Sequence, residues 1–130
     1  YGIVIMDKGK RTIKMECWPR FADPTDPAAR PYPGWPKTIS QTDNYLRKAV
    51  AFLPTIETDI DNPVIQVVNE KTAEVIYTIR INGRQFSPKV FAAGTYTIVV
   101  SEPDKQWSQS FKNIEATPNV NGKIEVTLTP

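Results

Sequence analysis

The chain has 130 residues, of which 40% are hydrophobic, and its net charge is +2. This is the size and apolar content of a domain with a core, and so small a charge argues against nucleic acid or an anionic membrane as partner. The absence of histidine removes the commonest metal ligand and general base, and the single cysteine, Cys17, excludes an internal disulfide. No apolar run approaches the roughly 18 residues that a membrane-spanning helix needs.

Residues 1–18 alternate in a way that predicts a β-hairpin, with "DKGKR" as the turn, in which Gly9 is able to take a positive φ. The apolar residues of the first strand are Tyr1, Ile3 and Ile5 on one face and Val4 and Met6 on the other, and those of the return strand are Ile13, Met15 and Cys17. A strand with two apolar faces needs cover on both sides. We therefore expect part of that cover to come from an upstream domain of a longer polypeptide. Cys17, inside an alternating strand, is expected to be a buried structural thiol.

Residues 19–63 form a second, proline-rich segment. Prolines lack a backbone donor and push the preceding residue toward extended geometry, so little regular structure is expected between 19 and 36. Interleaved aromatic residues argue against a disordered linker. We predict an ordered strap that covers apolar surface. Within it, residues 42–54 suit either a short helix or an extended segment that Pro54 ends.

Residues 64–130 predict an antiparallel β-sandwich of five or six short strands, with turns every 8 to 12 residues or so. Strands are expected at 64–69, 73–81, 84–91, 94–100, 107–115 and 123–129. Ala73, Val75, Tyr77, Ile79 and Ile81 are expected on one inward face, and Tyr96, Ile98 and Val100 on another. Asn82-Gly83 is a hairpin signal, and Pro88 confines its strand to an edge. The predicted fold class is therefore all-β.

Carboxylates cluster in "ETDIDN", where Glu57, Asp59 and Asp61 alternate. Such oxygen ligands suit Ca²⁺, although the central glycine and terminal glutamate of an EF-hand loop are missing. Turn and cap chemistry explains the same residues. A hydrolase using these aspartates together with Asp23 and Asp26 is a further hypothesis, and it requires the groups to converge in one cleft.

Aromatic residues suggest a second kind of site. Tyr32, Trp35 and Trp107 are able to form a platform for sugar rings, and covering the core is the competing interpretation. No glycine-rich phosphate loop is present, because "INGRQ" and "VNGKI" are turns.

Two stretches resemble a known family. "YGIVIMDKGKRTIKMECWPR" and "DPAARPYPGWPKTI", about a third of the chain, are similar to the C-terminal part of exported metallophosphoesterases of the calcineurin-like, alkaline-phosphatase-D-like type. The later "AGTYTIVV" is similar to a strand of immunoglobulin-like or transthyretin-like accessory domains. The resemblance implies a hairpin left from the catalytic sandwich and an exported location, periplasmic or at the cell surface. The family's metal ligands match no position here.

These observations predict a non-catalytic accessory domain without a cofactor of its own, which supports a phosphoesterase or presents substrate to it. The expected interdomain contact consists of Tyr1, Ile3, Ile5, Ile13 and Met15. A carbohydrate- or cell-surface-binding module is the alternative.

Overall fold

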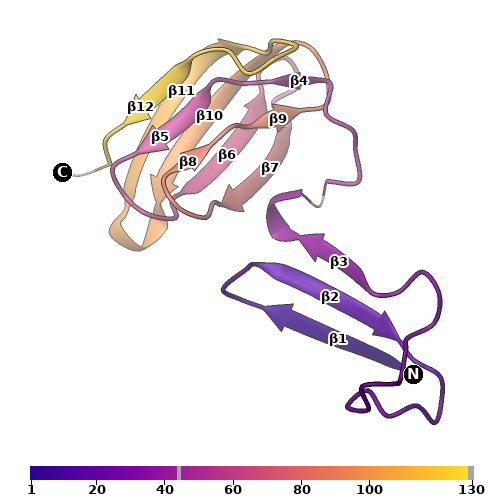
Figure 1. Ribbon diagram of the computed structural model, residues 1–130. Helices are drawn as coiled ribbons and strands as arrows, with labels where there is room; N and C mark the ends of the chain where they lie inside the picture. The colour runs from indigo at the N-terminus through magenta and orange to yellow at the C-terminus, as the bar shows by residue number, and fades with distance from the viewer. Residues whose placement is uncertain (44, 129–130) are drawn as a thin grey trace. The chain divides into compact units, whose positions relative to one another are not determined.

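The computed structural model describes residues 1–43 and 45–128, and the chain divides into two compact units, Tyr1–Leu46 and Arg47–Pro130. The regular structure of the described residues consists of β-strands and two short 3₁₀ turns, so the all-β prediction is confirmed (Figure 1). No helical segment in residues 1–43 and 45–128 has the length and hydrophobicity that crossing a lipid bilayer requires.

The first unit is a three-stranded antiparallel sheet in the order β1-β2-β3. Its strands are β1 (Gly2–Asp7), β2 (Thr12–Cys17) and β3 (Lys37–Ser40), followed by the 3₁₀ turn η1 (Gln41–Asp43). The predicted hairpin is confirmed, and Asp7 and Thr12 form its last pair before the turn. Gly9 is not the residue with positive φ, because Arg11 takes this conformation at 52°.

Residues 19–36 connect β2 to β3 through a series of turns, as the many prolines predict. Tyr32 N donates to Cys17 O over 2.8 Å, and Tyr1 Oη donates to Ala22 O over 2.7 Å. The segment is thereby fixed to the end of the sheet that contains Trp18, the buried tryptophan that follows β2.

The remainder of the predicted strap contains more regular structure than its composition suggests. Residues 37–40 are β3, and residues from Arg47 onward belong to the second unit, where they supply two strands. The boundary between the compact units therefore lies before residue 47 and not at 63. Of the two conformations considered for 42–54, the structure shows a 3₁₀ turn that ends at Asp43 and a strand at Ala51–Phe52.

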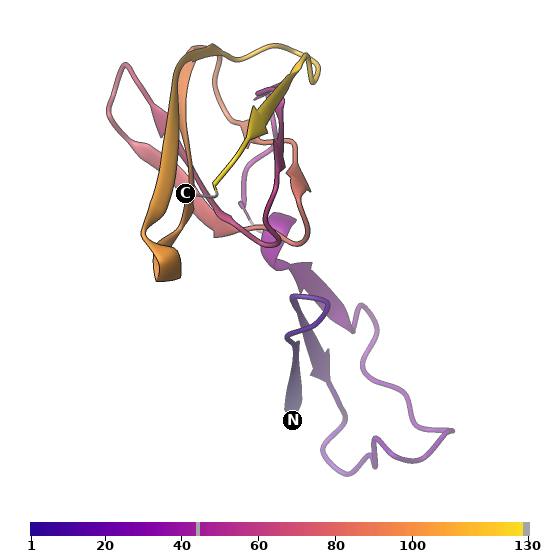
Figure 2. The same cartoon turned by 90° about the vertical axis from the view of Figure 1, so that its left-hand side faces the viewer.

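The second unit consists of two facing layers (Figure 2). One layer is the antiparallel sheet β11-β10-β6-β7, and the other consists of the sheet β12-β5-β8 and the separate two-stranded sheet β4-β9. The first layer contains β6 (Val64–Asn69), β7 (Val75–Arg80), β10 (Thr95–Glu102) and β11 (Trp107–Glu115). The second contains β4 (Ala51–Phe52), β5 (Thr55–Thr58), β8 (Gln85–Phe86), β9 (Lys89–Val90) and β12 (Lys123–Val126). The turn η2 (Pro103–Lys105) joins β10 to β11.

The pair β5 and β12 is parallel, with Thr55 opposite Lys123 and Thr58 opposite Val126. A parallel pair cannot be joined by a tight turn and requires a long crossover. Here the whole of the first layer lies between the two strands in sequence. The last strand of the chain thereby completes the layer that β5 begins.

The core of the second unit lies between the layers and contains aliphatic residues from both. Tyr96, Ile98 and Val100 point inward, as their alternation in β10 predicts. The full cluster is Ala51, Leu53, Ile56, Ile65, Val67, Ile79, Ile81, Val90, Tyr96, Ile98, Val100, Val126 and Leu128. It holds the two sheets together by burying their apolar faces against each other.

The inward face predicted for residues 73–81 is only partly correct. Ile79 and Ile81 are buried, but Ala73 and Val75 are exposed. The register of β7 against β6 shifts between Tyr77 and Val75, which adds one residue to β7. Because side chains alternate with a period of two, this bulge turns the start of the strand away from the core.

The Asn82-Gly83 turn does not make a hairpin. β7 pairs with β6, and β8 pairs with β5, so the turn carries the chain from one layer to the other. Gly83 takes a φ of 83°, and its N–H donates to Asn62 Oδ1 over 2.7 Å. Pro88 separates β8 from β9, in line with its predicted place on an irregular edge strand.

Candidate functional site

The pairing of β1 with β2 assigns each side chain of the first unit to a face of its sheet. Val4 is opposite Met15 and Met6 is opposite Ile13, and Ile13 is in turn opposite Ile39 of β3. Directly paired residues of an antiparallel ladder lie on the same side of the sheet. We call the set Val4, Met6, Ile13, Met15 and Ile39 the apolar face.

The apolar face is largely open to solvent. Met6 is 77% exposed, Val4 61% and Ile13 43%, while Met15 and Ile39 are half-buried. An apolar patch on a sheet of this size marks a protein contact or a ligand surface more often than a neutral surface. It is the strongest candidate site in the part of the chain that the structure describes.

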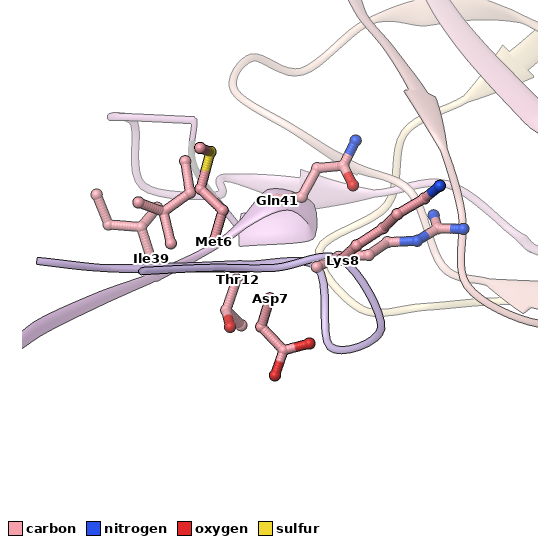
Figure 3. A pocket seen from close by; sticks show the side chains of 8 residues that line it. Met6, Asp7, Lys8, Thr12, Ile39 and Gln41 are labelled. Carbon is pink, nitrogen blue, oxygen red and sulfur yellow. The ribbon is translucent and has the colours of Figure 1, made fainter. Parts of the chain in front are cut away.

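A pocket of about 450 Å³ lies at the turn end of this face. Figure 3 shows Met6, Ile39 and Gln41 on one side of the sheet and Asp7 and Thr12 on the other. Asp7 Oδ1 accepts a hydrogen bond of 2.9 Å from Lys10 N, and this bond is the main cause of the lowered pKa of the Asp7 carboxyl. This hydrogen bond fixes the conformation of the charged turn, which lies next to the apolar face.

The five residues predicted as an interdomain contact do not share one surface. Ile13 and Met15 belong to the apolar face, whereas Ile3 and Ile5 lie on the opposite face. There Ile3 is opposite Glu16 and Ile5 is opposite Lys14, so that face mixes apolar and charged side chains. Val4, Met6 and Ile39 were not among the residues predicted for this contact. They share a face with Ile13 and Met15 only through the register in which β1 and β3 pair with β2, and alternation within one strand does not show that register.

Tyr1, the fifth of these residues, lies at the end of the sheet where Trp18 and the loop after β2 are found. Its backbone nitrogen donates to Trp18 O over 2.9 Å, and the residue is 49% exposed.

The predicted aromatic residues are divided between the units. Tyr32 and Trp35 lie in the turn before β3, where Trp35 N donates to Tyr32 O over 3.1 Å, and both rings are partly exposed. Trp107 begins β11 in the second unit and packs against the core. Lys105 Nζ lies 4.5 Å from the centroid of the Trp107 ring, where a cation–π contact forms.

The three carboxylates considered for Ca²⁺ bind separate partners. Glu57 pairs with Lys123, whose hydrogen bond is the main cause of the lowered pKa of Glu57. Asp59 Oδ1 accepts from Leu128 N over 2.9 Å. Asp61 pairs with Arg84 at 2.9 Å, and its pKa is lowered by that contact. Among the described residues, no group of three or more histidine, cysteine, aspartate or glutamate side chains is placed to hold a metal ion.

The remaining candidates have local roles in the first unit. Asp23 Oδ1 accepts from Thr25 N over 2.8 Å, and Asp26 Oδ1 accepts from Ala28 N over the same distance, so both aspartates cap turns. Cys17 is half-buried at the end of β2, which corrects the expectation of a buried thiol.

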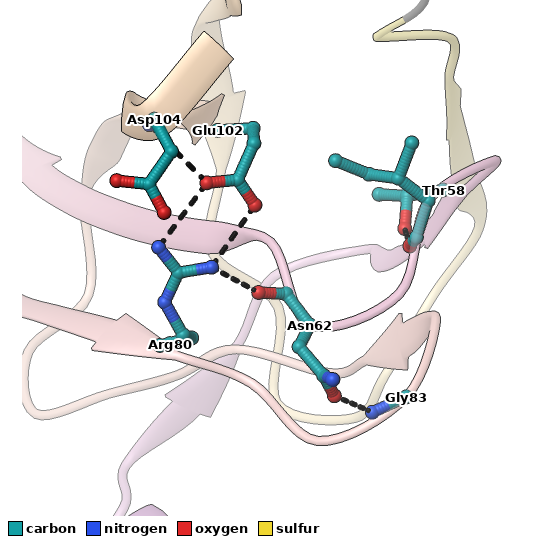
Figure 4. A network of polar contacts seen from close by, with 7 residues as sticks. Thr58, Asn62, Arg80, Gly83, Glu102 and Asp104 are labelled. Atoms are coloured by element: carbon teal, nitrogen blue, oxygen red, sulfur yellow. Dashed lines mark hydrogen bonds and ion pairs between the residues drawn. The ribbon is translucent and has the colours of Figure 1, made fainter.

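The second unit contains a polar network that sequence reasoning did not select (Figure 4). Arg80 Nη1 and Nη2 donate to the two oxygens of Glu102 over 3.0 and 3.2 Å, and Nη1 also donates to Asn62 O over 2.9 Å. Hydrogen bonds from Arg80 are the main cause of the lowered pKa of the buried Glu102, and burial acts against them. The network joins β7, β10 and the turn before β6. We therefore interpret it as a structural link between these elements and not as a site for a ligand.

No protein-family model, no curated protein and no solved structure matches this chain.

Proposed function

We propose that the chain is a non-catalytic accessory module of an exported metallophosphoesterase and that its first unit docks on the catalytic domain. The observation that carries this proposal is the exposed apolar face, with Met6 at 77% and Val4 at 61%. The resemblance of residues 1–20 and 26–39 to that family supports the choice of partner. The sandwich of the second unit, immunoglobulin-like or transthyretin-like in this proposal, supplies the folded body of the module.

The energetics of a three-stranded sheet support a docking role for the first unit. Such a sheet gains stability when one face is covered, because strand pairing alone is marginal in water. Within residues 1–43 and 45–46, Trp18 is the one buried hydrophobic side chain, and it lies at the loop end. A partner that covers Val4, Met6 and Ile13 removes apolar surface from water at about 25 cal/mol per Å².

The side chains of the described residues support a role without catalysis. The chain has no histidine, so it lacks the usual metal ligand and general base of phosphoester hydrolysis. The acidic groups Glu57, Asp61 and Glu102 are each paired with a cation. In the proposal, the hydrolytic site belongs to the partner domain.

The direct experiment begins with the reading frame that encodes residues upstream of Tyr1. Its product is expressed without residues 1–130, and its binding to the 130-residue chain is measured by calorimetry. We expect binding that Met6→Asp weakens at least tenfold, because a carboxylate then lies in the contact. The matched control is Val120→Asp, at an exposed residue of the second unit, which should bind as the unaltered chain does.

Hydrolysis of bis(p-nitrophenyl) phosphate with Mn²⁺ provides the second readout. The chain alone should show no turnover, and the upstream product should show it. Turnover by the chain alone, or an upstream product that fails to bind it, contradicts the proposal.

Carbohydrate binding is the second candidate function, and it is favoured by the exposed rings of Tyr32 (49%) and Trp35 (38%) in one turn. Partly exposed aromatic rings are able to stack on the apolar faces of sugars. A titration with a panel of oligosaccharides should then quench tryptophan fluorescence, and Trp35→Ala should abolish the change while Trp107→Phe retains it. An unchanged spectrum across the panel excludes this function.

A further inference from the structure

In the part of the chain that the structure describes, no strand pairs with the outer edge of β1, and this edge presents backbone groups. Tyr1 N donates to Trp18 O and Trp18 N donates to Tyr1 O, so these residues form a hydrogen-bonded pair of the β1–β2 ladder. Hydrogen-bonded and non-bonded pairs alternate along an antiparallel ladder. The N–H and C=O groups of Gly2, Val4 and Met6 therefore point away from β2, toward the edge where the sheet ends.

This edge lacks the features by which proteins normally prevent strand pairing, namely prolines, bulges, charges and short length. β1 has six residues in continuous register, and no proline or charge occurs before Asp7. The other long edge strands of the described residues, β7 and β11, each contain a register irregularity. The remaining edge strands have four residues or fewer.

We propose that two copies of this chain pair through β1, antiparallel and about a two-fold axis at Val4. In this register, Val4 exchanges both backbone hydrogen bonds with Val4 of the second copy, and Gly2 exchanges both with Met6. Every outward N–H and C=O of Gly2, Val4 and Met6 is then satisfied. Sliding one copy by two residues toward the turn puts Gly2 opposite Lys8, which lies beyond the end of β1, and sliding by one residue opposes outward groups to inward ones.

The side chains of β1 suit this register. Ile3 lies opposite Ile5 of the second copy and Tyr1 lies opposite Asp7, so no two like charges face each other. A two-fold axis perpendicular to the sheet keeps the apolar faces of both copies on the same side. A second copy is the occupant because the edge is complementary to itself about Val4, which is the condition for a closed symmetric pair.

The inference is independent of the proposed function. It uses the backbone edge of β1, whereas docking on a catalytic domain uses the side chains of the apolar face. The mass of the chain alone tests the first, and binding to the upstream product tests the second. Either is able to fail without the other.

The test is the mass of the full chain by light scattering during size exclusion, over a concentration series. We expect a species of twice the 14.7 kDa chain that dissociates on dilution. Val4→Lys and Val4→Glu each place two like charges across the axis, and each variant should elute as a monomer. Val4 is 61% exposed, so both variants should retain the circular dichroism of the unaltered chain.

Mixing the Val4→Lys and Val4→Glu variants provides the decisive observation. The introduced ammonium and carboxylate face each other only in the register centred on this position, so the mixture should recover the dimer, with one copy of each variant by native mass spectrometry. The matched controls are Thr38→Lys and Thr38→Glu, at an exposed residue of β3 on the opposite edge of the sheet. Both should remain dimeric.

The inference is overturned by an unaltered chain that is monomeric at every concentration, by Val4 variants that remain dimeric, or by a mixture that stays monomeric. An unaltered chain that forms open polymers also contradicts the closed two-fold pair.

Discussion

The two units of this chain use similar strands in opposite ways. Among the described residues of the second unit, thirteen buried hydrophobic side chains form one cluster between two layers. In the described part of the first unit, Trp18 is the one buried hydrophobic side chain, and nine large hydrophobic residues are exposed. Those nine are Tyr1, Val4, Ile5, Met6, Ile13, Phe21, Tyr32, Trp35 and Leu46.

The difference between the units lies in the second layer and not in the strands themselves. β1 and β10 both contain several aliphatic residues, and both pair in antiparallel ladders. Within its own unit, β10 faces a second sheet that contributes Ile56 and Val126 to the core, whereas the unit of β1 contains a single sheet. A sheet is stable in water when its apolar face has such a layer. The first unit therefore has the sequence of a buried sheet without the cover that the second unit provides for itself.

Separating the units gives the largest expected effect. The fragment 47–130 should retain a cooperative unfolding transition and dispersed amide resonances, because its core is complete. The fragment 1–46 should lose both, since three strands with one buried tryptophan do not stabilise themselves. Circular dichroism and heteronuclear NMR of each fragment measure the outcome. If fragment 1–46 unfolds cooperatively, the conclusion that only the second unit has a core of its own is wrong.

Paired truncations of isoleucine give the next effect. Ile98→Ala should reduce the free energy of unfolding by about 2–5 kcal/mol, because it leaves a cavity in the closed core. Ile5→Ala, at a residue that is 45% exposed, should change it by about 0.5 kcal/mol or less. Urea denaturation of the full chain followed by circular dichroism compares them. Equal losses for the two variants contradict the assignment of the core to the second unit alone.

The ion pair between Arg80 and Glu102 gives a smaller effect. Arg80→Leu leaves the carboxylate of Glu102 buried without its cation, which should destabilise the second unit by about 1–3 kcal/mol. Arg84→Leu is the matched control, because Arg84 and Asp61 form an exposed pair that should contribute little to stability. Thermal unfolding of both variants at neutral pH measures the difference. Equal destabilisation shows that burial of Glu102 is without consequence.

The smallest effect is expected in the free energy of unfolding at acidic pH. The pKa of Glu102 in the folded chain is below its ordinary value of 4.5, so its contribution is present above pH 4.5 and is lost as pH falls through the lower folded value. Arg80→Leu should therefore reduce the dependence of unfolding free energy on pH below 4.5. Denaturation at a series of acidic pH values compares the variant with the unaltered chain. If the unfolding free energies of the variant and the unaltered chain change with pH in parallel, the pKa of Glu102 does not contribute to stability in this way.

The sequence pattern predicted those strands that form through residues close to them in the chain. Alternation and a short polar turn identified the hairpin of residues 1–18, and the same pattern identified the inward face of β10. The strands β3 and β5 were missed. β3 has four residues after a run of prolines and becomes a strand because β2 offers it an edge. β5, with the sequence "TIET", is held between β12 and β8, which are distant in sequence.

The apolar character of the hairpin could be predicted from the sequence, but the residues that share one face of it could not. The sequence indicated that the hairpin has unneeded apolar residues, and exposed Ile5 and Ile13 agree with that expectation. Which of them share a face depends on the register across residues 8–11, and Arg11 at a positive φ is part of that turn. No spacing rule fixes this register, so Met6 could not be assigned beside Ile13 from alternation alone.

The parallel pairing of β5 with β12 has a consequence for biosynthesis. A ribosome delivers Val126 well after Ile56, so the layer that β5 begins stays incomplete until β12 has been translated. Contacts between residues so far apart in sequence close late and slow the folding of a β-protein. The nascent sandwich is thus exposed to misassembly until β12 leaves the exit tunnel, and a ribosome stalled before residue 123 carries a half-closed domain.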